Sequence, residues 1–186
     1  EEADIPVSSS VSTTCTIYNG SNLESQNYIN WSAPVESYLT TSPDGYLMRV
    51  QSGAIDGKLL IEYYDTGYNL KKTMTLDLPL SDFGGFYETG DNYYILTGQS
   101  NTEKDNNKEV YRVSKYSKSW QTLGSCGLFG ANTTVPFDAG SARMAINGKY
   151  LFVRTCHEMY NGHQANVTFS VDTSDMSIKD SFTDVM

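Results

Sequence analysis

Two histidines, His157 and His163, stand six residues apart in a segment that gathers several side chains able to do chemistry. The same segment carries Arg154, Glu158 and Tyr160. Imidazole and carboxylate groups can ligate a metal ion, and both can exchange protons with a bound substrate. We therefore take these five residues as candidates for a ligand-binding or acid–base site.

The spacing of the two histidines matches no defined metal-ligand pattern, so no metal site is assigned. The alternative interpretation is that residues 155–164 form a loop at the tip of a long hairpin. Asn161 and Gly162 would form its turn, because Asn-Gly favours the tight turns of β-hairpins. Histidines in such a loop would be solvated or bonded to nearby backbone.

Three carboxylates form a second candidate set, Asp82, Asp138 and Glu158. A pair of such acids can hydrolyse a glycosidic bond, one as the acid and the other as the base or nucleophile. Acidic residues at strand starts also cap turns, and that is the alternative interpretation. A serine nucleophile is not indicated, because the chain has no Gly-x-Ser-x-Gly motif. We favour binding over catalysis and assign no catalytic residue.

The charge balance excludes some partners. The chain has 22 acidic and 13 basic residues and a net charge of −9, which argues against a nucleic-acid partner. No apolar run of about 18 residues is present, so no membrane span is predicted. The acidity indicates solubility, with divalent-cation binding as the alternative, and no other cofactor is expected. No calcium-loop spacing is present.

The chain has three cysteines, Cys15, Cys126 and Cys156, and their spacing fits no zinc pattern. One disulfide with a free thiol is compatible with an oxidising compartment. Three buried thiols are equally compatible, because cysteine packs as a small apolar residue.

The elements that must position these residues follow a repeat of turn, aromatic-led strand, polar excursion and second strand. Tyr46, Tyr94 and Tyr150 lead the repeated strand, 48 residues apart (46 to 94) and then 56 (94 to 150). A period of about 40–50 residues built from short strands is typical of β-propeller blades, each a four-stranded antiparallel sheet. We expect the three tyrosines to occupy equivalent positions.

The repeat divides the chain into four parts. Residues 1–34 are an N-terminal extension with a strand that would close the propeller, and 35–83 are a blade. Residues 84–140 are a blade with a long connection, and 141–186 are a further blade. Known propellers have at least four blades, so we expect part of a seven- or eight-bladed propeller, completed by a second chain or copy. A compact four-bladed or sandwich-like fold is the alternative.

The repeated Gly-x-Tyr-(Leu/Ile)-(Phe/Leu/Met) strand and the stretches 154–160 and 163–166 resemble blades of secreted β-propeller proteins of Firmicutes-type bacteria. The resemblance covers residues 35–183. It implies a propeller fold and a secreted or cell-surface location, but no catalytic residues. The chain lacks the spaced combination of Gly-His and Trp-Asp that marks WD repeats, and it lacks the Asp-box of sialidases.

In a propeller, the polar loops 51–57, 99–108 and 155–164 would share one face around the axis. The connections into the inner strands would add further side chains: Glu36, Asp82, Phe83, Asp138 and Arg143. Numerous aromatic side chains would either fill the core between blades or bind sugars and peptides: Tyr63, Tyr64, Tyr68, Tyr87, Tyr93, Tyr160, Trp31 and Trp120. We predict a secreted module that binds carbohydrate or protein at this axial face. The alternatives are a glycan hydrolase and a half-propeller completed by its partner.

Overall fold

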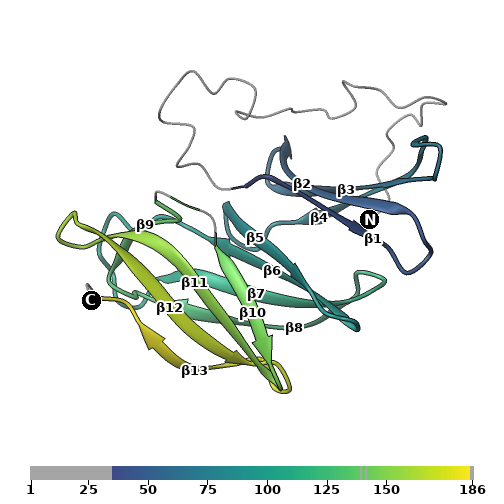
Figure 1. Cartoon of the computed structure of the whole chain (residues 1–186). Helices are drawn as coiled ribbons and strands as arrows, with labels where there is room; N and C mark the ends of the chain where they lie inside the picture. Colours follow the sequence, from purple (N-terminus) through teal and green to yellow (C-terminus); the bar gives the residue numbers. More distant parts are fainter. Residues whose placement is uncertain (1–34, 139, 141, 185–186) are drawn as a thin grey trace. The chain divides into compact units, whose positions relative to one another are not determined.

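The computed structural model describes residues 35–138, 140 and 142–184, which form β-strands joined by turns and short loops (Figure 1). The strands make three antiparallel sheets of four or five strands, which confirms the all-β class. No helix in these ranges is long and apolar enough to cross a membrane. The predicted N-terminal extension, with its closing strand, Cys15 and Trp31, lies outside the described residues.

Two compact units divide the chain. Glu36–Leu78 contains the first sheet, in which each strand pairs with the next along the chain. Its strands are β1 (Ser37–Thr41), β2 (Leu47–Ile55), β3 (Lys58–Tyr64) and β4 (Leu70–Asp77). Pro43 and Gly45 belong to the turn before β2, and Gly45 has a φ of 83°, which glycine adopts without strain.

A charged pair crosses the centre of the first sheet. Arg49 on β2 stands opposite Glu62 on β3, and its Nε lies 2.7 Å from Glu62 Oε2. The Tyr64 hydroxyl donates to the other carboxylate oxygen at 3.0 Å. Burial raises the pKa of Glu62, and Arg49 and Tyr64 offset part of that rise. The buried carboxylate is therefore tolerated because its partners satisfy it.

The unit Pro79–Met186 contains the second and third sheets. The second comprises β5 (Asp82–Glu88), β6 (Asn92–Gly98), β7 (Glu109–Ser117) and β8 (Thr122–Phe129), again in chain order. The third comprises β9 (Thr133–Pro136), β10 (Arg143–Asn147), β11 (Tyr150–Met159), β12 (Gln164–Asp172) and β13 (Ser177–Phe182). Strands β10 to β13 follow in order, and β9 pairs with the far end of β11.

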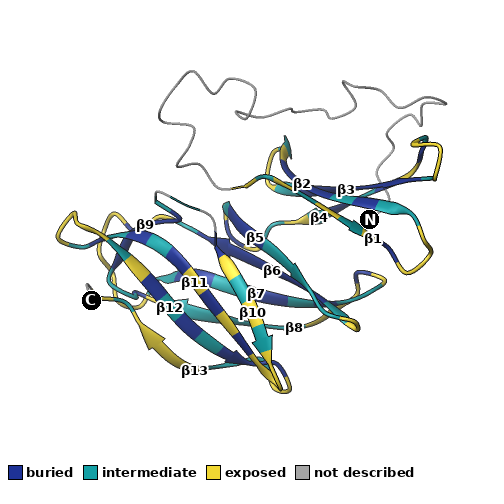
Figure 2. Cartoon of the chain, in the orientation of Figure 1, coloured by how far each residue is buried: buried dark blue, intermediate teal, exposed yellow. Residues whose placement is uncertain are grey.

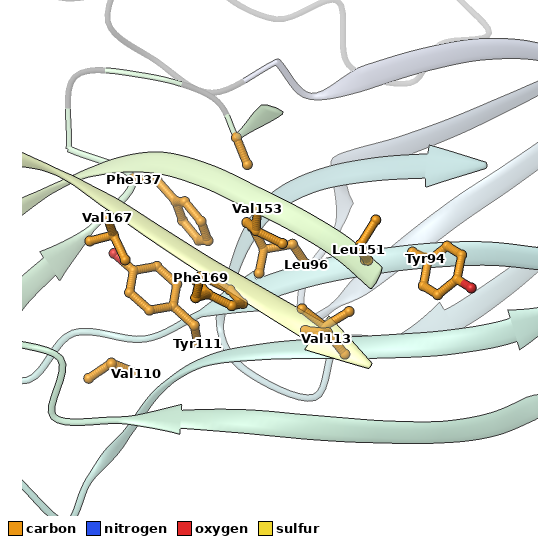
Figure 3. Packing of buried hydrophobic residues seen from close by; sticks show 12 residues of the cluster. Tyr94, Leu96, Val110, Tyr111, Val113, Phe137, Leu151, Val153, Val167 and Phe169 are labelled. Carbon is orange, nitrogen blue, oxygen red and sulfur yellow. The ribbon is translucent and has the colours of Figure 1, made fainter. Parts of the chain in front are cut away.

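The second and third sheets lie face to face and enclose the core of this unit (Figure 1). Strand β11 alternates along its length between buried side chains, which face the second sheet, and exposed ones (Figure 2). Figure 3 shows Tyr94, Leu96, Tyr111 and Val113 of the second sheet meeting side chains of the third, such as Phe169. The first strands of the two sheets, β5 and β10, are in contact, and so are the last, β8 and β13.

A bulge separates β9 from β10. Pro136, at the end of β9, stands opposite His157, and Arg143, at the start of β10, stands opposite Arg154, so only two β11 residues lie between the two pairings. The bulge turns Phe137 into the core, where its ring meets Tyr111 edge-on at 5.5 Å between centroids (Figure 3). Phe137 has a φ of 58°, an unfavourable conformation for a bulky residue, which burial of the ring offsets.

Two glycines of the second sheet make room for this ring. A Cβ at Gly84 would overlap the Phe137 ring. A Cβ at Gly98 would lie 2.7 Å from Phe137 Cε2 and 3.0 Å from Pro136 Cβ. The close neighbour of the Gly84 backbone is therefore a phenylalanine ring.

Some expectations from the sequence are wrong. Residues 155–164 are not one loop, because β11 continues to Met159 and β12 begins at Gln164. The three leading tyrosines are not equivalent: Tyr46 precedes β2 and is half-buried, Tyr94 is buried within β6, and Tyr150 is exposed at the start of β11. For four of the aromatic side chains the core alternative holds, because they are buried: Tyr63, Tyr64, Tyr93 and Trp120.

Substitution of Gly98 by alanine tests whether the Phe137 ring needs the bare backbone of Gly98 for its packing. We expect Gly98→Ala to lower the free energy of unfolding by about 1–3 kcal/mol, because the ring and Pro136 must move. Gly90→Ala is the matched control, since a Cβ there meets nothing within 4 Å, and it should change stability by less than about 0.5 kcal/mol. Urea denaturation measures both. Equal effects of the two substitutions would show that the ring does not constrain Gly98.

Candidate functional site

The exposed face of the third sheet arranges side chains in rows that run across its strands. One row is Arg143, Arg154, Thr168 and Phe182, contributed by β10, β11, β12 and β13 in turn. The next row is Ala145, Phe152, Ser170 and Asp180. Directly opposite residues in such rows have Cβ atoms roughly 4.5–5.5 Å apart, so the members of a row act as neighbours.

A groove of about 130 Å³ lies between these two rows. Phe152 and Phe182 line it, with 45% and 48% of their surfaces exposed. The remaining lining residues are Thr168, Phe169, Ser170, Asp180 and Ser181. The groove therefore combines two aromatic side chains with hydroxyl groups and one carboxylate, and we call it the β12–β13 groove.

Among the described residues, the two arginines at the head of the first row have no acidic partner. Arg143 and Arg154 are both exposed, and no carboxylate of the described residues lies within 4.0 Å of either guanidinium. Arg154 Nη1 lies 3.4 Å from Thr168 Oγ1, a long hydrogen bond that leads toward the β12–β13 groove.

Two of the three predicted acids lie at the other end of the same sheet. Glu158 on β11 stands opposite Gln164 on β12, and Gln164 Nε2 donates to Asp138 Oδ2 at 2.7 Å. Thr134 Oγ1 lies 3.0 Å from Glu158 Oε1. The structure thus brings Asp138 and Glu158 to the same glutamine. The third acid, Asp82, lies at the start of β5 in the second sheet, where Ser81 Oγ donates to it at 3.0 Å.

His157 is not on a loop but in strand β11, and its side chain is fully buried. Thr133 Oγ1 lies 2.7 Å from its Nδ1. Burial lowers the pKa of His157 and outweighs the opposing effects of the Thr183 backbone and the Asp184 charge. The imidazole is therefore neutral near pH 7 and faces the interior rather than a ligand.

Tyr160 and His163 occupy the turn between β11 and β12. This turn is the predicted Asn161-Gly162 turn, with a backbone hydrogen bond from Gly162 to Met159 and a φ of 82° at Gly162. His163 is exposed. The two histidines predicted to act together therefore lie in different environments, one buried and one in solvent.

Tyr160 joins this turn to the loop between β6 and β7. Its hydroxyl donates to Asn106 Oδ1 at 3.1 Å and accepts from Asn101 Nδ2 at 3.2 Å. Its backbone nitrogen donates to Asn132 Oδ1 at 3.2 Å. Two of the polar segments predicted to share a face, 99–108 and 155–164, thus meet at one end of this unit.

The metal and thiol candidates can be placed as well. Nowhere in the described part of the chain do three His, Cys, Asp or Glu side chains gather closely enough to hold a metal ion. Cys126 and Cys156 are free thiols. Burial raises the pKa of the Cys126 thiol to about 11, so it is protonated at neutral pH and a poor nucleophile.

The sequence interpretation missed Phe152, Thr168 and Phe182. A signal for one of them was present, because Phe152 lies two residues before Arg154 in a strand and must share its face. Thr168 and Phe182 come from other strands, and only the pairing registers place them in the same row.

Comparison with known proteins adds no family. No protein-family model matches the chain, and no curated protein matches it significantly.

The buried imidazole predicts a pH dependence of stability. The unfolded His157 gains a proton below about pH 6.5, whereas the folded form stays neutral to lower pH. We expect stability to fall as the pH drops below 6.5, by at most about 1.4 kcal/mol per pH unit from this residue. The loss ends where folded His157 itself titrates.

Denaturation between pH 7.5 and 5.5 measures this effect. His157→Gln should flatten the slope in that window, and His163→Gln, which alters the exposed histidine, should keep it. An unchanged slope in the His157 variant would contradict the assignment.

Proposed function

We propose that the protein is a non-catalytic binding module for carbohydrate and that the β12–β13 groove contacts the sugar. One observation carries the proposal: Phe152 and Phe182, both nearly half exposed, flank hydroxyl groups and Asp180 in an open groove. Aromatic rings stack on the apolar faces of sugar rings, and neighbouring polar groups bond to the hydroxyls.

The size of the groove favours one ring of an extended chain. Its volume of about 130 Å³ is well below the roughly 300–1,000 Å³ of pockets that enclose a small molecule. An extended glycan would continue along the sheet face, where Asn166 and Gln164 are exposed next along β12. Amide side chains of this kind can donate to and accept from sugar hydroxyls.

We further propose that the three sheets are blades of a β-propeller from a secreted or cell-surface protein. Two features support the blades: each sheet has consecutive antiparallel strands, and the second and third sheets stack with first strand on first and last on last. Completion of the propeller by a second chain or copy is an alternative to the groove proposal, because blades pack face to face and the next blade would cover the outer face of the third sheet. The exported location implied by the resemblance belongs to both proposals.

Titration calorimetry with neutral and acidic oligosaccharides tests the binding proposal. Phe152→Ala and Phe182→Ala should each weaken binding by about tenfold, because each removes a stacking ring. Phe129→Ala is the matched control, since Phe129 is 54% exposed on β8 in the other sheet, and it should leave binding unchanged.

Two results would overturn the proposal. Release of new reducing ends, lost in Asp138→Asn or Glu158→Gln, would show a hydrolase that uses the acids beside Gln164. A dimer in light scattering that Phe152→Ala dissociates, without glycan binding, would show that the face meets another copy of the chain.

A further inference from the structure

The paired arginines of the first row make an unusual arrangement for this chain. Arg143 and Arg154 stand directly opposite each other on β10 and β11, and both are exposed. Like charges directly opposite across two strands repel and destabilise the pair. The fold therefore keeps a mildly unfavourable arrangement on the same face that carries the β12–β13 groove.

The chain has enough carboxylate side chains to pair with both arginines. Its net charge is −9, and most of its other basic residues have a carboxylate within 4.0 Å. Those residues are Arg49, Lys58, Lys71, Lys108, Arg112, Lys118, Lys149 and Lys179. The arginine pair is thus a local positive site, in a predominantly acidic protein, that an external anion would complement.

The pair is continuous with the groove. Arg154 leans toward Thr168, which lines the groove, and Phe182 closes the same row on β13. A sugar ring held between Phe152 and Phe182 would therefore have a neighbouring position beside the guanidinium groups. The planar guanidinium fork matches a carboxylate or sulfate with two parallel hydrogen bonds.

We propose that Arg143 and Arg154 form a subsite for an anionic substituent on the bound glycan, a uronate carboxylate or a sulfate ester. This inference rests on the proposed function, because it assumes that the glycan occupies the adjoining groove. It makes the module selective for acidic polysaccharides. The net charge of −9 disfavours binding of such a polymer elsewhere, and Asp180 in the groove favours the orientation that turns the anion toward the arginines.

The test compares an acidic oligosaccharide with its neutral methyl ester and with a second acidic ligand. Hexagalacturonate and its fully methyl-esterified form share one backbone, and a sulfated galactan oligosaccharide supplies the second anion. We expect the uronate or the sulfated ligand to bind at least tenfold more tightly than the neutral ester, with the preference reduced at high salt. Binding of the uronate alone would identify the carboxylate as the anion, and binding of the sulfated ligand alone the sulfate.

Arg143→Gln and Arg154→Gln should each reduce the preference by about tenfold while leaving binding of the neutral ester unchanged. Lys104→Gln is the control, since it removes one exposed positive charge from the loop between β6 and β7. Thermal unfolding should be no less cooperative in the arginine variants, because each relieves a repulsion.

The outcomes separate the two proposals. If neutral and acidic ligands bind equally and Phe152→Ala weakens both, the anionic subsite is overturned and the carbohydrate module stands. If the lysine control loses as much preference as the arginine variants, the selectivity is a general charge effect and the subsite is again overturned. If none of the ligands binds, the carbohydrate module itself fails.

Discussion

The packing of the Phe137 ring against the second sheet is the constraint on which the third sheet depends. The ring can enter the core only because Gly84 and Gly98 present bare backbone to it. Phe137 directly follows β9, and β10 begins with Arg143 opposite Arg154. That register decides which β10 side chains complete the rows of the outer face, whereas the β12–β13 groove is set by the registers of β11, β12 and β13.

Much of the fold could be predicted from local pattern. The repeat of turn, aromatic-led strand and second strand predicted antiparallel sheets of short strands, and the described residues form three such sheets, because alternating apolar residues between turn residues specify short strands. Strand β9 was missed because Thr133–Pro136 is short, ends in proline and lies in a glycine-rich connection. It pairs with the part of β11 beyond Val153, where Arg154, His157 and Glu158 resemble a polar loop. These polar residues can lie in a strand because each has a neighbour. Arg154 lies beside Thr168, Glu158 accepts a hydrogen bond from Thr134, and His157 lies within hydrogen-bond distance of the buried Thr133 hydroxyl.

The candidate site was predictable only in part. Arg143, Arg154, Asp138 and Glu158 were identified as residues able to bind a ligand. The structure places three of them on one sheet and Asp138 in the connection between its strands β9 and β10. His157 was identified for its chemistry. Its position two residues from the buried Thr155 and Met159 places it on the inner face of the sheet, where it is buried in the core. No sequence pattern could place Phe182 beside Arg154, since the two are linked only through Thr168 and the registers of three strands. The three leading tyrosines were also not predictable from local sequence. They follow similar turns, yet Tyr46 precedes its strand, Tyr94 is buried within one and Tyr150 is exposed at the start of another.

The bulge between β9 and β10 interrupts one edge of the third sheet, and this has a consequence for solubility. Long, regular edge strands offer unpaired amide and carbonyl groups to other chains and promote aggregation. Here the edge beside β11 is split by a bulge into the short strands β9 and β10. The opposite edge strand, β13, carries Lys179 and Asp180 and has a register shift in its pairing with β12. A foreign strand could join only a few residues at either edge before the pairing failed. The same insertion that seats an aromatic ring in the interior thus also discourages accidental polymerisation.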